Sequence, residues 1–254
     1  MNRGSVGIVM MGLVVGCLSS SPVGAEQPLA TPELEGWWIL EATTASILSS
    51  RAVGEIPSQS TVLSVVKIKQ RGRALKLHSR TCDVRLEADT PMVTTRVPRR
   101  FVEAIDDRRR RGQLKRQHGA WYVHVERDWE LLGLQMEDPA RESLPTDKED
   151  PRIIDQDDSG HPGMTIELEG RMGGEVHIIR RSWDQMMGRL QGDERIAGPI
   201  RWDFEQHTVD ASRRWLRSDL SGTPDMESSR FRMQRHHGQE RPRCRALRGH
   251  PPER

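Results

Sequence analysis

The residues best spaced for chemistry lie in an acidic segment in the middle of the chain, residues 155–160. Side-chain oxygens at the alternate positions Asp155, Asp157 and Ser159 converge on one hard cation if Gly160 makes a sharp turn, and Ca²⁺ prefers such oxygen ligands. An EF-hand loop also needs a bidentate acid at its twelfth position, where this chain has an isoleucine. The spacing therefore predicts either a short Ca²⁺ site that is not an EF-hand or a solvated acidic turn.

The sequence carries no pattern that marks a common catalytic site. We find no nucleophile elbow, no zinc-protease helix, no phosphate-binding glycine loop and no Cys/His pairing. We therefore predict no catalytic residues and expect a protein that is not an enzyme.

Residues 1–25 have the pattern of a secretory signal peptide. Arg3 precedes an apolar run over residues 6–15, which is shorter than the roughly 20 residues of a membrane-spanning helix. Cleavage after Ala25 is one alternative, and a lipobox at residues 14–17 with lipidation of Cys17 is the other. We expect an exported protein, periplasmic or secreted, which is membrane-anchored in the second case.

Both processing routes leave the same pair of cysteines. Cys17 is either removed with the signal peptide or consumed by acylation, so Cys82 and Cys244 remain. An even pair in an oxidising compartment predicts a Cys82–Cys244 disulfide. The alternative is two buried free cysteines.

Charge divides the rest of the chain into segments. We predict a linker at 26–33, a single β domain at 34–235 that contains an acidic loop at 137–160, and a basic flexible tail at 236–254. The net charge of only +2, with no recognisable nucleic-acid module, argues against nucleic acid as a partner. The arginines of the tail suit an anionic envelope surface. We expect a monomer.

Period-two alternation of apolar and polar residues recurs along the β domain. It is clearest at 61–70, 120–126, 164–168 and 200–205, and glycine-containing turns separate these runs. A change of phase near residues 79–81 indicates a bulge or tight turn. This pattern predicts a mostly β fold, an antiparallel barrel or sandwich.

We expect one or two short helices beside these strands. Pro98 suits the first turn of a helix that carries Phe101, and Thr208 suits the cap of a second helix at 209–216. The basic run 108–111 is most simply a helix end or a loop.

Alternation places one set of apolar side chains on common faces of the strands. We predict that these residues face one interior, which is either a filled core or an apolar cavity lined partly by indoles. The predicted ligand-binding residues are Trp121, Val123, Val125, Trp202 and Phe204.

Two resemblances bear on the fold. The stretch 150–163, with Asp-Pro-Arg followed by Asp-x-Asp-x-Ser-Gly-x-Pro-Gly, resembles an uncharacterised family of exported bacterial β-rich proteins, to which no activity attaches. The motif Gly36-x-Trp38 is similar to the motif that opens lipocalin-type barrels, where the tryptophan plugs the closed end. The second resemblance implies a lipocalin-like barrel.

These observations predict a non-catalytic envelope protein that binds an apolar small molecule inside a barrel. The alternative is a structural or interaction module of the envelope, with a Ca²⁺-stabilised acidic loop and a basic tail. The first function needs an open interior, whereas the second needs a filled core.

Overall fold

The computed structural model describes residues 30–50, 54–88, 94–171, 173–217 and 221–247, together with Met1. The chain separates into two units, Met1–Ala30 and Thr31–Arg254, and almost all of the first lies outside the described residues. The predicted signal peptide and Cys17 therefore lie outside the described residues, and the account below concerns the second unit.

The described residues of this unit form ten strands and a few short helical turns. The strands are β1 (Gly36–Ser50), β2 (Gly54–Arg71), β3 (Ala74–Ala88), β4 (Thr94–Arg96), β5 (Arg108–Gln117), β6 (Ala120–Leu132), β7 (Met164–Glu169), β8 (Gly174–Gln191), β9 (Arg195–Ala211) and β10 (Ser221–His236). The helices are α1 (Arg99–Ala104), α2 (Cys244–Leu247) and the 3-10 turn η1 (Arg214–Leu216).

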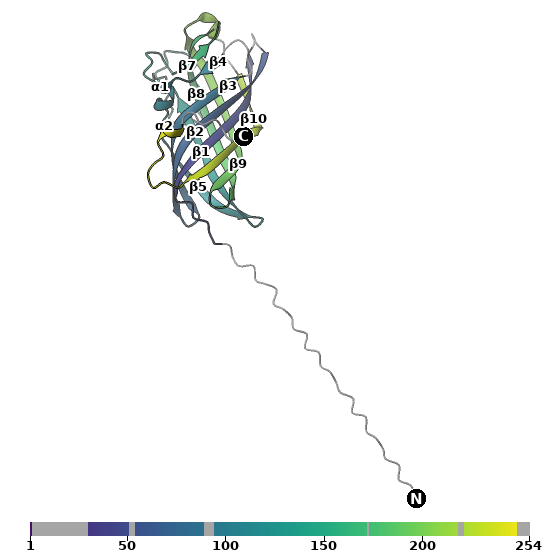
Figure 1. Cartoon of the computed structure of the whole chain (residues 1–254). Helices are drawn as coiled ribbons and strands as arrows, with labels where there is room; N and C mark the ends of the chain where they lie inside the picture. Colours follow the sequence, from purple (N-terminus) through teal and green to yellow (C-terminus); the bar gives the residue numbers. More distant parts are fainter. Residues whose placement is uncertain (2–29, 51–53, 89–93, 172, 218–220, 248–254) are drawn as a thin grey trace. The chain divides into compact units, whose positions relative to one another are not determined.

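Eight of the strands form a closed ring. Its order is β8-β6-β5-β3-β2-β1-β10-β9, and β9 pairs with β8 to complete it. All these pairs are antiparallel, and each strand neighbours the ring strand before and after it in sequence. The fold is therefore an up-and-down barrel (Figure 1), which confirms the prediction of an antiparallel β fold with short helices. β4 and β7 extend one edge beside β8.

Tight turns set the register of the long hairpins. His118 and Gly119 join β5 to β6 with φ angles of 48° and 75°. Positive φ at both central residues gives a turn whose twist matches that of the flanking strands, and glycine adopts this conformation at little cost.

One end of the barrel is filled with apolar side chains. Trp38 is fully buried there, and its indole Nε1 donates a 2.9 Å hydrogen bond to the carbonyl oxygen of Leu34. The guanidinium carbon of Arg235 lies 4.7 Å from the centroid of a Trp38 ring. Trp38 belongs to the main hydrophobic cluster, which also includes Val123, Val125, Ile196, Phe231 and Met233. The tryptophan of the Gly36-x-Trp38 motif thus lies in the packed end.

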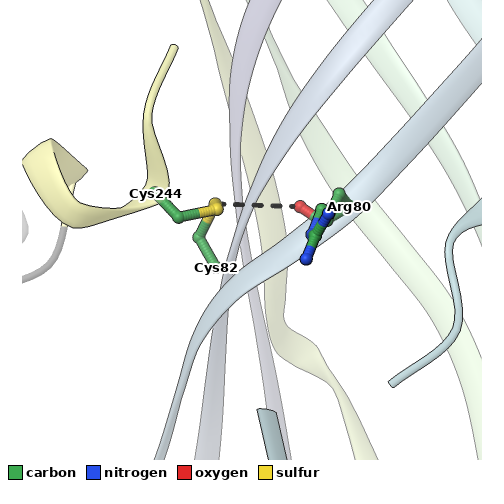
Figure 2. The surroundings of a disulfide bond; sticks show 3 residues. All are labelled: Arg80, Cys82 and Cys244. Atoms are coloured by element: carbon green, nitrogen blue, oxygen red, sulfur yellow. Dashed lines mark hydrogen bonds between the residues drawn. A yellow bond between two sulfur atoms is a disulfide. The ribbon is translucent and has the colours of Figure 1, made fainter. Parts of the chain in front are cut away.

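A bulge places Cys82 on β3 opposite the C-terminal segment. Ser64 pairs with Thr81 and Leu63 with Asp83, so Cys82 is the extra residue, next to the position where the sequence predicted a change of phase. Cys82 is fully buried and forms a disulfide with Cys244 of α2, with the Cα atoms 4.9 Å apart (Figure 2). This confirms the predicted pairing and ties α2 to β3.

One of the predictions about helices is confirmed, and two are wrong. α1 begins directly after Pro98 and buries Phe101, as predicted. The predicted helix at 209–216 is wrong, because β9 continues to Ala211 and only the short turn η1 follows. The predicted helix end or loop at 108–111 is also wrong, since these arginines begin β5. Pairing with β8 and β3 respectively overrides these local preferences.

Among the described residues, no helix has the length and apolar character needed to cross a membrane.

Candidate functional site

The other half of the barrel holds a cavity of about 500 Å³. Its wall is built by strand alternation, because successive side chains point to opposite faces of a strand. Even-numbered residues of β1, β2, β8 and β9 therefore line it, together with Trp183 of β8. The apolar part of this wall includes Leu40, Ala42, Leu48, Ile56, Val62, Val84, Leu86, Leu132, Ile166, Val176, Ile178, Trp202 and Phe204.

Small polar side chains interrupt the apolar wall. Most are serines, which lie on β1, β2, β3 and β8, and a hydroxyl leaves more space than a branched apolar side chain. They are Ser46, Ser58, Ser60, Ser64, Ser79 and Ser182. The result is an interior that is mainly apolar but also offers hydrogen-bonding groups, as small-molecule sites commonly do.

A charged cluster lies where the cavity meets the packed end. Asp184 of β8 accepts hydrogen bonds from Arg108 at 2.8 Å and from Arg110 at 2.6 Å. The Nη2 of Arg110 also donates to the carbonyl oxygens of Glu126 and Asp184, at 2.7 and 2.8 Å. Met186, the next inward residue of β8, already belongs to the packed core. The cluster therefore forms a polar boundary between the two halves.

The arginines keep Asp184 ionised in this buried place. Burial by itself would raise the pKa of the Asp184 carboxyl, but the positive charges of Arg108 and Arg110 hold the pKa below its ordinary value. Asp128 and Glu130 of β6 add negative charge beside Arg108, at 3.0 and 3.9 Å. The paired arginines are thus neutralised by the barrel itself.

Arg180 of β8 lines the same cavity but contacts aromatic rings in place of carboxylates. Its guanidinium carbon lies 4.8 Å from the ring centroid of Phe204 and 5.9 Å from a ring of Trp202. Its Nε is buried and has no hydrogen-bond partner in the described chain. Burial lowers the pKa of Arg180, and only the more distant negative charge of Glu130 opposes this.

Phe204 and Trp202 form a rigid aromatic surface beneath Arg180. Their rings stack with centroids 5.2 Å apart, and the indole Nε1 of Trp202 donates a 2.9 Å hydrogen bond to the hydroxyl of Ser229. A Cβ atom at Gly222 would overlap the Phe204 ring, so the glycine makes room for it. Both aromatic rings are thereby fixed in the cavity wall.

The predicted ligand-binding residues divide between the two halves of the barrel. Trp202 and Phe204 line the cavity where it borders the main hydrophobic cluster, whereas Val123 and Val125 are fully buried inside that cluster. Trp121 packs partly buried against the same packed core. Alternation correctly placed all of them toward one interior, but it did not tell which part of that interior is hollow.

The charged residues of the cavity were not predicted from the sequence. Arg108 and Arg110 alternate with exterior residues along β5, which is the signal that they share an inward face with Leu114. A register shift in β6 after Val125 turns Glu130 toward the cavity and Asp128 toward Arg108. A run of charges normally indicates a solvated surface, and this expectation concealed the pattern.

The predicted Ca²⁺ ligands hold the acidic loop together. Asp155 accepts hydrogen bonds from the backbone of Ser159 at 2.9 Å and of Gly160 at 2.8 Å. The buried Asp157 accepts one from the backbone of Thr165 at 2.9 Å, and its Oδ1 has no partner in the described chain. The Ser159 hydroxyl lies 2.9 Å from that of Thr165. Binding of Ca²⁺ here stays a prediction.

A second group of metal-ligating types lies beside this loop. His161, Glu175 and His177 each place one ligand atom within 4.8 Å of the others. The two imidazoles, however, stack with centroids 4.1 Å apart, while Glu175 lies 3.8 Å from Arg100. Thr165 makes a 3.0 Å hydrogen bond to Nδ1 of His177. Parallel rings do not aim their in-plane lone pairs at one ion, so this geometry favours a stacked pair.

Comparison with family models, with curated proteins and with solved structures gives no match to this chain.

Proposed function

We propose that the protein is an exported, non-catalytic binding protein that holds an apolar small molecule inside its barrel. The observation that carries the proposal is the cavity of about 500 Å³, bounded by aliphatic side chains, Trp202 and Phe204. Cavities of roughly 300–1,000 Å³ with mainly apolar walls are typical of small-molecule sites. A structural module would have no need of such a space, because filling it would stabilise the fold.

The architecture supports the same proposal. An up-and-down barrel of eight strands encloses a volume that side chains either fill or leave for one small ligand. In this chain the end near Trp38 is filled and the other half is hollow. This division agrees with the resemblance of Gly36-x-Trp38 to the opening motif of lipocalin-type barrels.

Export is part of the proposal and rests on the N-terminal sequence and on the disulfide. Bonds such as Cys82–Cys244 persist in oxidising compartments and are rare in the reducing cytosol. Periplasmic or secreted protein follows from cleavage after Ala25, and a membrane anchor follows from lipidation of Cys17. The basic tail would then lie near the anionic envelope surface.

A cavity-filling variant tests the proposed function. Ser60 faces the cavity from β2, and its neighbour Gln59 is exposed on the other face of the strand. Ser60→Phe should abolish binding of apolar ligands, whereas the matched Gln59→Phe should leave it unchanged. Tryptophan fluorescence during titration with dodecanol and polyaromatic compounds measures both, since Trp202 lies in the wall.

The same titration decides between the two classes of function. Saturable quenching that disappears in Ser60→Phe supports a ligand-binding barrel. No response of the wild-type chain to any compound in the panel would contradict the proposal and favour the structural or interaction module.

A further inference from the structure

The arginines inside the barrel differ in whether the fold supplies their counter-charge. Arg108 and Arg110 share the carboxylate of Asp184 through hydrogen bonds of 2.8 and 2.6 Å. Arg180, by contrast, forms no ion pair and donates no hydrogen bond to the described residues. Its contacts are the faces of Phe204 and Trp202.

An unpaired guanidinium is a costly group to bury. Arginine stays protonated in proteins, so it cannot escape the cost by losing its charge as lysine does. Contact with aromatic faces recovers part of the lost hydration energy, but it satisfies none of the N–H donors. The acid whose charge acts on Arg180 is Glu130, and its carboxylate lies 3.9 Å from Arg108. The donors of Arg180 are therefore left to the contents of the cavity.

The other residues of the cavity wall indicate what kind of ligand would complement Arg180. Apolar side chains from most of the strands form the larger part of the wall, and among the described residues Arg180 is the cation there without an ion pair or a hydrogen bond. A planar guanidinium binds a carboxylate through two parallel hydrogen bonds. The complementary molecule has an apolar body and one carboxylate.

We propose that the cavity selects an amphipathic carboxylate, with its acid group bound by Arg180 and its apolar body against Trp202, Phe204 and the aliphatic wall. This inference rests on the proposed function, because it names the class of ligand for the same cavity. Phe204 and Trp202 hold the guanidinium from one side and leave its donors for the ligand.

A matched pair of ligands isolates the role of the charge. Dodecanoate and dodecanol share the same chain and differ in the head group. In isothermal titration of the full chain, dodecanoate should bind roughly 10- to 100-fold more tightly, the range expected for a charge-assisted hydrogen bond inside a protein. Arg180→Gln should remove this preference, because dodecanoate loses much more affinity than dodecanol does. Arg180→Lys should restore part of the preference.

Two further variants show whether the effect belongs to this site. Arg189→Gln removes an exposed arginine of the same strand and should leave the preference intact. Glu130→Gln removes the acid that acts on Arg180, so it should increase the preference for dodecanoate over dodecanol. A merely structural role of Arg180 would not produce these opposite effects.

The outcomes separate this inference from the proposed function. Equal affinities for dodecanoate and dodecanol in the wild-type chain, or a preference that survives in Arg180→Gln, would overturn the carboxylate site while leaving an apolar cavity in place. Failure of both ligands to bind would overturn the proposed function together with this inference. If Arg180→Gln fails to fold, the wild-type ligand preference and Glu130→Gln still decide the matter.

Discussion

The two halves of the barrel use tryptophan in different ways. In the packed end, Trp38 is fully buried, its Nε1 is bonded to Leu34, and Arg235 covers its ring. In the hollow half, Trp202 and Phe204 border the cavity, and the arginine over their rings lies inside the barrel. An arginine thus lies over aromatic rings in both halves. In the packed end this contact covers a buried core residue, whereas in the hollow half it places a guanidinium beside the cavity. This contrast suggests that stability is concentrated in the first half and binding in the second.

The largest expected effect tests where the stability lies. Trp38→Ala should lower the free energy of unfolding by roughly 3–5 kcal/mol, because it removes a fully buried aromatic side chain from a packed core. Phe204→Ala should cost less, about 1–2 kcal/mol, since that ring already borders open space. Urea denaturation of both variants measures the difference. Equal losses would contradict the division into a packed and a hollow half.

The boundary between the halves depends on Asp184. Asp184→Asn leaves Arg108 and Arg110 without their shared carboxylate and should cost roughly 3–5 kcal/mol. Asp193→Asn, at an exposed turn, is the control and should change little. Chemical denaturation near neutral pH measures both variants.

Asp184 also predicts how stability depends on pH. Its pKa is lower in the folded state than the unfolded value of about 3.9. Its contribution is therefore complete above the unfolded pKa and is lost as the pH falls through the folded pKa. Wild-type stability should drop below about pH 4, and the profile of Asp184→Asn should be flatter in that range. Parallel profiles would show that another group controls the acid response.

The disulfide should contribute less to the free energy of unfolding than Trp38 of the packed core does. Replacing both Cys82 and Cys244 by serine removes the link between residues 162 positions apart and should cost roughly 2–4 kcal/mol. A reducing agent should lower the melting temperature of the wild-type chain to about that of the double variant. The double variant should not respond to the reductant, and a response there would assign the effect to another group.

Removal of the Arg180 guanidinium should stabilise the protein, in contrast to the substitutions above. Arg180→Met replaces a buried guanidinium that has no partner and should raise the stability of the ligand-free protein by about 1 kcal/mol. Thermal denaturation without ligand measures the change. A loss as large as that of Asp184→Asn would mean that Arg180 is a structural group of the same kind as Arg110.

The smallest expected effect concerns the acidic loop, outside both halves of the interior. If Asp155, Asp157 and Ser159 bind Ca²⁺, the ion should stabilise the wild-type chain by at most about 1 kcal/mol at a few times its dissociation constant. Asp155→Ala should remove that increment. Melting curves of both proteins with Ca²⁺ and with a chelator measure it, and identical wild-type curves would identify the loop as a solvated turn.

The sequence by itself determined the local periodicity and the inventory of groups. Alternation predicted the strands and placed Val123 and Trp202 toward one interior, and the even pair of cysteines predicted the Cys82–Cys244 bond. The prediction from alternation succeeded because side-chain direction along a strand depends only on the backbone of that strand. Elements that depend on pairing with distant segments were predicted wrongly, as the strand continuing to Ala211 illustrates.

Only the tertiary structure decided that the barrel closes and that half of it is hollow. Closure requires β8 to pair with β9 and β10 with β1, and neither pairing is visible in the strand sequences. Bulges reverse the inward parity, as the register shift in β6 does before Asp128. The environment of a charge depends on which strands meet across the interior, so Asp184 pairs with Arg108 and Arg110 while the Nε of Arg180 has no hydrogen-bond partner among the described residues.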